Sequence, residues 1–208
     1  GAALAAQQTE RPAFWSWDMG GEVIGSSSLV RTDNGLSASF HTNELTPGTA
    51  VTLWYVIFNY PELCSDGRCG PDDMGLAKPA QGDFLYGGGH VVGGSGAGNF
   101  GGHLKVGDTS RSGLAERLVQ RGVCQEVETC ATPGLTNPKG ALVILALHDH
   151  GPALTGQALV KQISTFLGDC HAGDIGDPEG FATGPDDLPI PAGGYCSTII
   201  RSPHMPMP

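Results

Sequence analysis

The chain has 208 residues, which is enough for one large domain with a real hydrophobic core. It carries 21 acidic and 11 basic residues, a net charge of -10, and its Lys and Arg residues are scattered. Nucleic-acid phosphates and anionic membranes bind clustered basic side chains, so both are excluded as partners. No apolar run approaches the roughly 18 residues of a membrane span, so no transmembrane segment is predicted.

Residues 1–21 are predicted to form an N-terminal arm. Its first residues are small, and Ala3-Leu4-Ala5 matches the A-x-A site at the end of a signal peptide. This pattern predicts export from the cytoplasm. The arm also carries Phe14, Trp15 and Trp17, which are too apolar to stay in water and are expected to pack on the body or on a partner.

From residue 22 the pattern is typical of β-structure. Residues 23–31 and 36–42 flank the turn Thr32-Asp33-Asn34-Gly35, in which Asn-Gly tolerates positive φ at both turn positions, so a hairpin is predicted. Residues 49–59 follow, with both faces apolar and many β-branched and aromatic side chains. This stretch is predicted to be a central strand.

Further strands are predicted over 84–92, 97–106, 141–148 and 195–201. The segment 108–121 is predicted to be helical because Leu114, Leu118 and Arg121 follow a helical spacing and Gly122 provides a stop. Residues 157–167 fit either a helix or a strand. The predicted fold is mainly β: a Greek-key β-sandwich over residues 22–201, with one short helix, long disulfide-stapled loops and a tail over 202–208.

The six cysteines indicate a disulfide framework. Six cysteines allow 15 connectivities, and the simplest pairs each with its neighbour in sequence. No C-x2-C pair typical of a zinc site occurs. We therefore predict an oxidising compartment, either extracellular or periplasmic. The predicted disulfides are Cys64–Cys69, Cys124–Cys130 and Cys170–Cys196.

The motif His148-Asp149-His150 is the sharpest chemical feature. It ends the apolar run Ala141–Leu147, and side chains two residues apart on a strand share a face. We expect the two imidazoles where the strand meets solvent, able to chelate one copper or zinc ion. A third ligand would come from a neighbouring strand. The alternative is a hydrogen-bonded histidine pair at a strand end. The candidate third ligands are His90, His103 and His41.

Acidic, glycine-rich loops indicate a second candidate site. Calcium binds six to eight oxygen ligands from such loops, although the spacing of an EF-hand is missing. A structural calcium ion is therefore one hypothesis, and ordinary turn chemistry is the other. The acidic residues are Asp66, Asp72, Asp73, Asp169, Asp174, Asp177, Glu179, Asp186 and Asp187.

Three stretches of the chain resemble uncharacterised secreted bacterial β-sandwich proteins. They are residues 45–64, the run through His150-Gly151-Pro152, and residues 162–166 ahead of Cys170. More distantly, His148-x-His150-Gly151-Pro152 at the end of a strand is similar to CHRD domains and to the Cu/Zn superoxide dismutase sandwich. The resemblance implies a Greek-key β-sandwich. It touches only His148 and His150 among the candidate ligands, and it implies no particular activity.

Three functions follow as expectations. The first is a secreted structural or binding protein without catalytic activity, which assembles with itself or with another extracellular protein. The second is a copper- or zinc-binding protein or metalloenzyme that uses His148, His150 and one further histidine. The third is a hydrolase whose site no local motif reveals.

Overall fold

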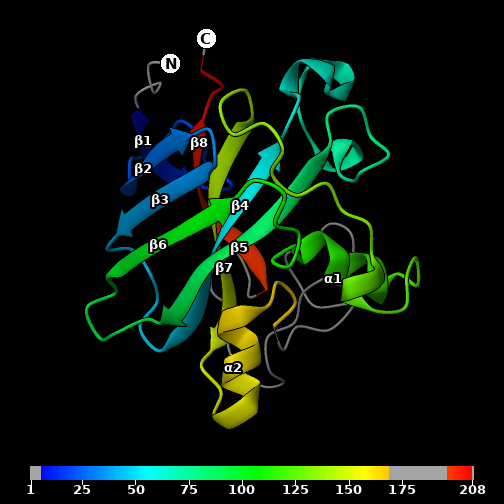
Figure 1. The fold of residues 1–208 in the computed structure, drawn as a ribbon. Coiled ribbons are helices and arrows are strands. Elements are labelled where there is room, and N and C mark those ends of the chain that lie inside the picture. The colour runs from blue at the N-terminus through cyan, green and yellow to red at the C-terminus, as the bar shows by residue number, and fades with distance from the viewer. Residues whose placement is uncertain (1–5, 169–195, 208) are drawn as a thin grey trace.

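Eight antiparallel strands form one sheet within the described residues of the computed structural model, which are 6–168 and 196–207. The strands lie in the order β5-β4-β7-β8-β1-β2-β3-β6 (Figure 1). The prediction of a mainly β protein is confirmed. The strands are β1 (Gln7–Trp15), β2 (Gly25–Thr32), β3 (Gly35–Thr42), β4 (Thr49–Phe58), β5 (Gly82–Val91), β6 (Gly98–Lys105), β7 (Leu142–Pro152) and β8 (Ser197–His204).

The sheet is nearly closed into a barrel, because β5 and β6 at the two ends of that order lie side by side (Figure 1). Glycine permits this approach: a Cβ on Gly102 would lie 2.5 Å from the carbonyl oxygen of Gly87. Inside the barrel, the hydroxyl of Tyr55 on β4 donates to the carbonyl of Gly102 on β6 at 2.6 Å. The strands make one continuous sheet, so a sandwich of two separate sheets is not confirmed.

Strands β4 and β7 are apolar on both faces because each face packs into a different hydrophobic cluster. Leu53, Tyr55 and Leu145 point inward into the core of the barrel. Trp54 points outward and packs with Phe84 in a second cluster on the outer face. This half of the sheet therefore buries apolar surface on both faces, which stabilises it.

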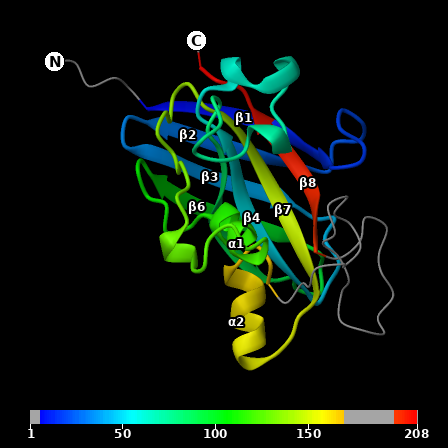
Figure 2. The same cartoon turned by 90° about the vertical axis from the view of Figure 1, so that its right-hand side faces the viewer.

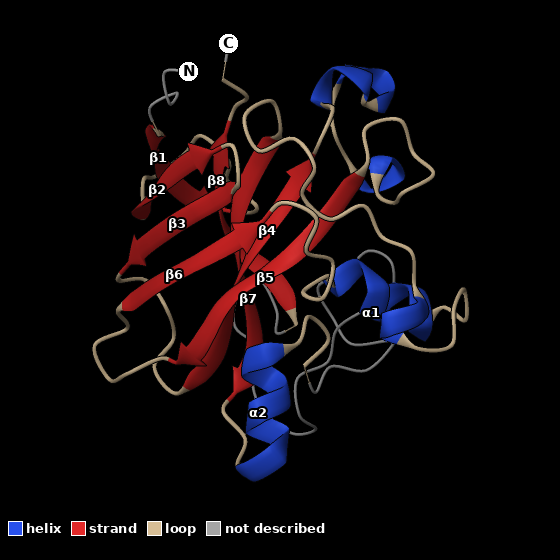
Figure 3. Cartoon of the chain, in the orientation of Figure 1, coloured by secondary structure: helices blue, strands red, loops and turns tan. Residues whose placement is uncertain are grey.

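Two α-helices cover the outer face of β4 and β5: α1 (Gly113–Gln120) and α2 (Gly156–Ser164) (Figure 2). They lie at the periphery of the strands (Figure 3). The predicted helix over 108–121 is confirmed in a shorter form, and Gly122 ends it with φ +71°. The ambiguous segment 157–167 is largely helical, so one short helix was too few. Short 3₁₀ turns lie at Pro61–Leu63, Ser65–Gly67, Pro71–Asp73 and Val127–Thr129.

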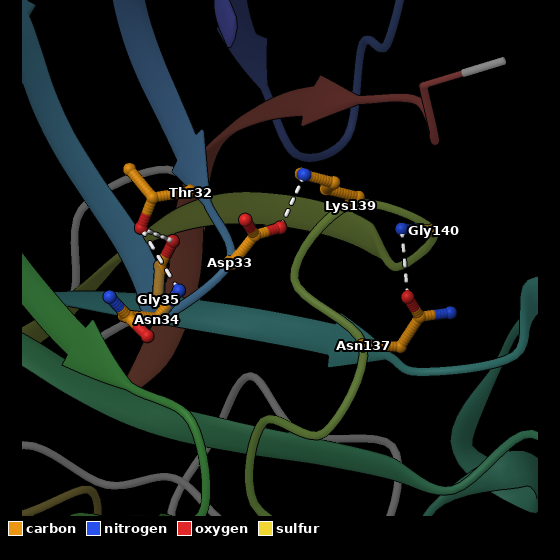
Figure 4. Close-up of polar contacts among 7 residues, drawn as sticks. All are labelled: Thr32, Asp33, Asn34, Gly35, Asn137, Lys139 and Gly140. Atoms are coloured by element: carbon orange, nitrogen blue, oxygen red, sulfur yellow. Dashed lines mark hydrogen bonds and ion pairs between the residues drawn. The ribbon is translucent and has the colours of Figure 1, made fainter. Parts of the chain in front are cut away.

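The predicted hairpin over residues 23–42 is confirmed, but its glycine has a different role from the one expected. The turn residues are Asp33 and Asn34, and Thr32 pairs with Gly35 (Figure 4). Gly35 does not adopt positive φ. A Cβ there would lie 1.9 Å from the Leu104 carbonyl oxygen, so glycine is needed for close approach of β6. The ammonium group of Lys139 pairs with Asp33 and ties the turn to the loop before β7 (Figure 4).

Most of the expected arm and part of the expected tail belong to the sheet. β1 lies between β8 and β2, and β8 runs to His204. The sequence does not indicate β1, because the alternation of polar and apolar side chains over residues 7–15 is weak. The proposed signal-peptide remnant Ala3-Leu4-Ala5 lies outside the described residues. None of the described helices is long and apolar enough to cross a membrane.

Two of the predicted disulfides, Cys64–Cys69 and Cys124–Cys130, are confirmed. Each closes a small loop at the surface. Cys196 is also disulfide-bonded, while its predicted partner Cys170 lies outside the described residues. Disulfides of this kind are typical of proteins from oxidising compartments.

Candidate functional site

His148 and His150 lie side by side on the outward face of β7. Their ring centroids are 4.9 Å apart, and the side chains are only 5% and 2% exposed. His148 pairs with the outward-facing Thr52 of β4, whereas Asp149 pairs with Val51, which faces the core. The sequence correctly places both imidazoles on one face. The expectation that they meet solvent was wrong, because β7 continues to Pro152 and other segments cover them.

The turn after α2 provides the cover. The ring of Phe166 lies over His148 with centroids 4.6 Å apart. Glu116 of α1 holds this turn, and its carboxylate accepts the backbone N–H of Phe166 at 3.0 Å and that of the next residue at 3.1 Å. Gly168 closes on the second imidazole so tightly that a Cβ would lie 2.4 Å from Nδ1 of His150.

A short chain of hydrogen bonds fixes the His150 ring. Its Nε2 lies 2.8 Å from Oγ1 of Thr52, which also accepts the indole N–H of Trp54 at 2.7 Å. Nδ1 of His148 and Nδ1 of His150 have no hydrogen-bond partner among the described residues. Two buried imidazole nitrogens are therefore left without a donor or an acceptor, which is unusual for buried polar atoms.

Burial keeps this pair uncharged. It lowers the pKa of His150 to about 3, and it lowers the pKa of His148 well below the ordinary value, with further contributions from the charges of His150 and Arg117. Neutral imidazole is the form that ligates metals, but it is a poor general acid. Asp149 on the opposite face has its pKa raised to about 6 by burial, although its Oδ1 accepts the N–H of Gly151 at 2.7 Å.

The three histidines proposed as further ligands are not brought to this pair. His90 stacks on Phe100 of the inner core, with centroids 4.3 Å apart, on the opposite face of the sheet. His103 and His41 are exposed on β6 and β3, where they contact Ser37 and Asn99. Among residues 6–168 and 196–207, no three His, Cys, Asp or Glu side chains form a group that could hold a metal ion.

The described acidic loop uses its carboxylate for its own backbone. Asp73 accepts the N–H of Ser65 at 2.7 Å and that of Gly70 at 2.9 Å, which lowers the pKa of its carboxyl. These bonds brace the loop that Cys64–Cys69 closes. The acidic residues from Asp169 to Asp187, the other half of the calcium hypothesis, lie outside the described residues.

A cleft of about 350 Å³ opens on the outer face of the sheet, next to the cover of the histidine pair. Its lining is mostly apolar, and three arginines contribute to it. No local motif pointed to it, because its lining comes from strands, a helix and a loop that are distant in sequence. The only signal was the outward apolar face of β4 and β7. The cleft is lined by Val56, Phe58, Cys69, Gly70, Pro71, Met74, Phe84, Leu114, Arg117, Leu118, Arg121, Ile144, Phe166, Thr198 and Arg201.

Two of these arginines show the electrostatic character of the cleft. The guanidinium carbon of Arg117 lies 5.9 Å from the centroid of the Phe166 ring, which is within the range of a cation–π contact. Partial desolvation lowers the pKa of Arg201. Positive charge is thus placed at the edge of an apolar surface.

Comparisons with known proteins add little. No protein-family model and no curated protein matches the chain. Among solved structures, it is similar to a mutant of an SOD-like protein from Bacillus subtilis, with 13% identity and a TM-score of 0.34, over 98% of this chain and 100% of that one. The residues of this chain alone therefore carry the functional proposal.

Proposed function

We propose that the chain is a secreted, non-catalytic binding protein of the cell exterior that holds a small apolar ligand in the cleft. One observation carries the proposal: an open cleft of about 350 Å³ with an apolar lining. Small-molecule sites are typically concave, largely apolar and a few hundred Å³ in volume. The disulfides support an extracellular or periplasmic location.

The finer fold assignment belongs to the same proposal. Strands β4, β5, β6 and β7 follow one another in the chain: β5 pairs with β4 and lies beside β6, and β7 returns to pair with β4. A fourth strand that returns beside the first is the pattern of a Greek key. We therefore propose a Greek-key barrel whose rigid outer face supports the cleft.

Binding of the neutral fluorophore N-phenyl-1-naphthylamine tests the ligand proposal. We expect a fluorescence increase with saturable one-to-one binding by the wild-type protein. Ile144→Trp fills the cleft from β7 and is expected to weaken binding about tenfold or more, since the apolar lining is no longer accessible. Val106→Trp, at an exposed position outside the cleft, is the matched control and should bind as wild type.

The folded state of each variant is checked by circular dichroism. If Ile144→Trp does not fold, Thr198→Trp, which fills the same cleft from β8, replaces it. Absence of saturable binding to wild type, or equal binding by the wild type and the folded cleft variant, would contradict the proposal.

Exposed apolar side chains next to β1 support self-association as a second proposal. Trp17 stacks on Trp15 with centroids 4.8 Å apart and remains 54% exposed, and Met19 and Val23 nearby are 46% and 60% exposed. Patches of this kind are typical of protein interfaces. We expect sedimentation analysis to show a dimer that Trp17→Ser dissociates. A wild-type monomer at all concentrations would remove this proposal.

The two partnerless imidazole nitrogens support a narrower form of the metal hypothesis. His148 and His150 alone would supply two ligands for copper or zinc, without His90, His103 or His41. Elemental analysis of protein purified without a histidine tag tests it. Stoichiometric copper or zinc in wild type that is lost in His148→Ala supports the site, and a metal content unchanged by that substitution removes it.

A further inference from the structure

Arginines gather at the cleft although the chain as a whole is acidic. Acidic residues outnumber basic ones by 21 to 11, yet three of the 11 basic residues line this one cleft. They are Arg117, Arg121 and Arg201. Among the described lining residues there is no Asp or Glu. Basic side chains are therefore concentrated at this cleft of an acidic protein.

The three arginines border the apolar surface from different elements. Arg117 and Arg121 are four residues apart at the end of α1, which places them on one side of the helix. Arg201 comes from β8, which lies beyond β4 and β7 from the strand on which α1 packs. Apolar side chains of these intervening strands, Val56 and Ile144, lie in the same cleft.

This arrangement combines two kinds of recognition. Guanidinium groups bind carboxylates, sulfonates and phosphates through charge-assisted hydrogen bonds, and these strengthen where water is partly excluded. The apolar lining recognises a hydrocarbon or aromatic body. A ligand that satisfies both must carry an anionic group on a small apolar body.

We propose that the cleft binds small anionic amphiphiles, namely aryl or short acyl chains that end in a carboxylate, sulfonate or phosphate, with Arg201 as a principal contact to the anionic group. This inference rests on the proposed function, because it names the ligand class of the same cleft. It adds that charge, and not apolar shape alone, selects the ligand.

The test uses two probes that share one apolar body. N-phenyl-1-naphthylamine is neutral, and 8-anilino-1-naphthalenesulfonate adds a sulfonate to the same ring system. We expect wild type to bind the sulfonate about tenfold more tightly than the neutral probe at low salt. The preference should shrink as ionic strength rises, because salt screens partly exposed charges.

Variants then assign the preference to the cleft. Arg201→Gln should remove most of the sulfonate preference and leave neutral-probe binding within about twofold, since only the charge contact is lost. Arg201→Lys should retain part of the preference. Arg11→Gln is the matched control, since Arg11 is an exposed arginine on β1 outside the cleft, and it should behave as wild type.

The outcomes separate the two proposals. Saturable binding of the neutral probe with no preference for the sulfonate would overturn the anionic ligand class and leave the apolar binding function standing. Equal weakening of both probes by Arg201→Gln would also overturn it, because Arg201 would then maintain the shape of the cleft only. No binding of either probe would remove both proposals.

Discussion

Single buried polar side chains hold this barrel together at several points. Asn59, which follows β4, is fully buried and makes four hydrogen bonds to backbone groups. Its amide donates to the carbonyls of Gln81 and Gly134, at 3.0 and 2.8 Å, and its Oδ1 accepts two further N–H groups, from Thr136 and Asn137. One side chain therefore satisfies the backbone of two loops that have no strand partner.

Asn59→Leu is expected to destabilise the protein by about 3 kcal/mol, because four backbone groups in buried or partly buried hydrogen bonds lose their partner. Urea unfolding at neutral pH measures this loss. Asn99→Ala, which removes an exposed amide from β6, should change stability by less than about 0.5 kcal/mol. A loss at Asn59 as small as that at Asn99 would show that water replaces these bonds.

The buried Asp149 carboxyl makes stability depend on pH. Its pKa is raised from 3.8 to about 6. Between these values the folded state binds more protons than the unfolded state, so this group lowers stability as pH rises, and the full cost is present above about pH 6. The stability of Asp149→Asn relative to wild type should therefore be greater at pH 8 than at pH 4, by roughly 2 kcal/mol. Urea unfolding of both proteins at pH 4 and pH 8 measures this stability difference. The same difference between variant and wild type at the two pH values would contradict the raised pKa of Asp149.

At the level of elements, the turn that follows α2 decides whether the histidine pair is accessible. Phe166 covers His148, and the turn itself is held to α1 by the Glu116 carboxylate. Gln162 of α2 makes a second tie, since its side-chain amide donates to the His150 and Pro152 carbonyls. Contacts among α1, α2, the turn after α2 and β7 thus keep both imidazoles covered.

Glu116→Ala should loosen this cover without unfolding the barrel. Two backbone N–H groups of the turn, those of Phe166 and Leu167, lose their acceptor, so the turn should open more often and expose His148. We expect carbethoxylation of His148 by diethyl pyrocarbonate to become about tenfold faster, as followed by mass spectrometry. Glu128→Ala, at an exposed position, is the control and should react as wild type. An unchanged rate in Glu116→Ala would show that other contacts hold the turn.

In the molecule as a whole, closure of the sheet depends on glycine at the β5–β6 junction. The three atoms nearest to a Cβ on Gly102 would all be backbone atoms of Gly87, at 2.5 to 3.0 Å, and backbone atoms cannot rotate away. At the neighbouring Gly101 the nearest atom to an added Cβ is the Ala38 carbonyl oxygen at 3.5 Å, an ordinary contact. An added methyl group is therefore expected to clash at Gly102 and to fit at Gly101.

Gly102→Ala should cost about 2 kcal/mol, because the two edges must separate to admit a methyl group. Gly101→Ala, its matched control, should fall within about 0.5 kcal/mol of wild type. Thermal or urea unfolding of both variants checks this. Equal stability of the two variants would mean that β5 and β6 can move apart at this junction without a cost in stability.

Several features could be predicted from residues because they depend on local patterns. The alternation after Gly35 indicated β3, and the long apolar run Thr49–Asn59 indicated a central strand. The short spacings of two cysteine pairs indicated their disulfides, and the i, i+2 spacing placed His148 and His150 on one face. Each of these rests on contacts or periodicities within a few residues.

The sequence by itself determined most of the strands, though not β1, together with the disulfide pairs at short spacing and the shared face of the two imidazoles, because backbone geometry sets these within a few residues. Only the tertiary structure decided that Phe166 buries His148, that His90 lies on the opposite face of the sheet, and that β5 meets β6. It also decided that Arg117 and Arg201, more than eighty positions apart, line one cleft. The physical reason is that these contacts depend on how strands far apart in sequence pair and curve, and no local propensity encodes that arrangement.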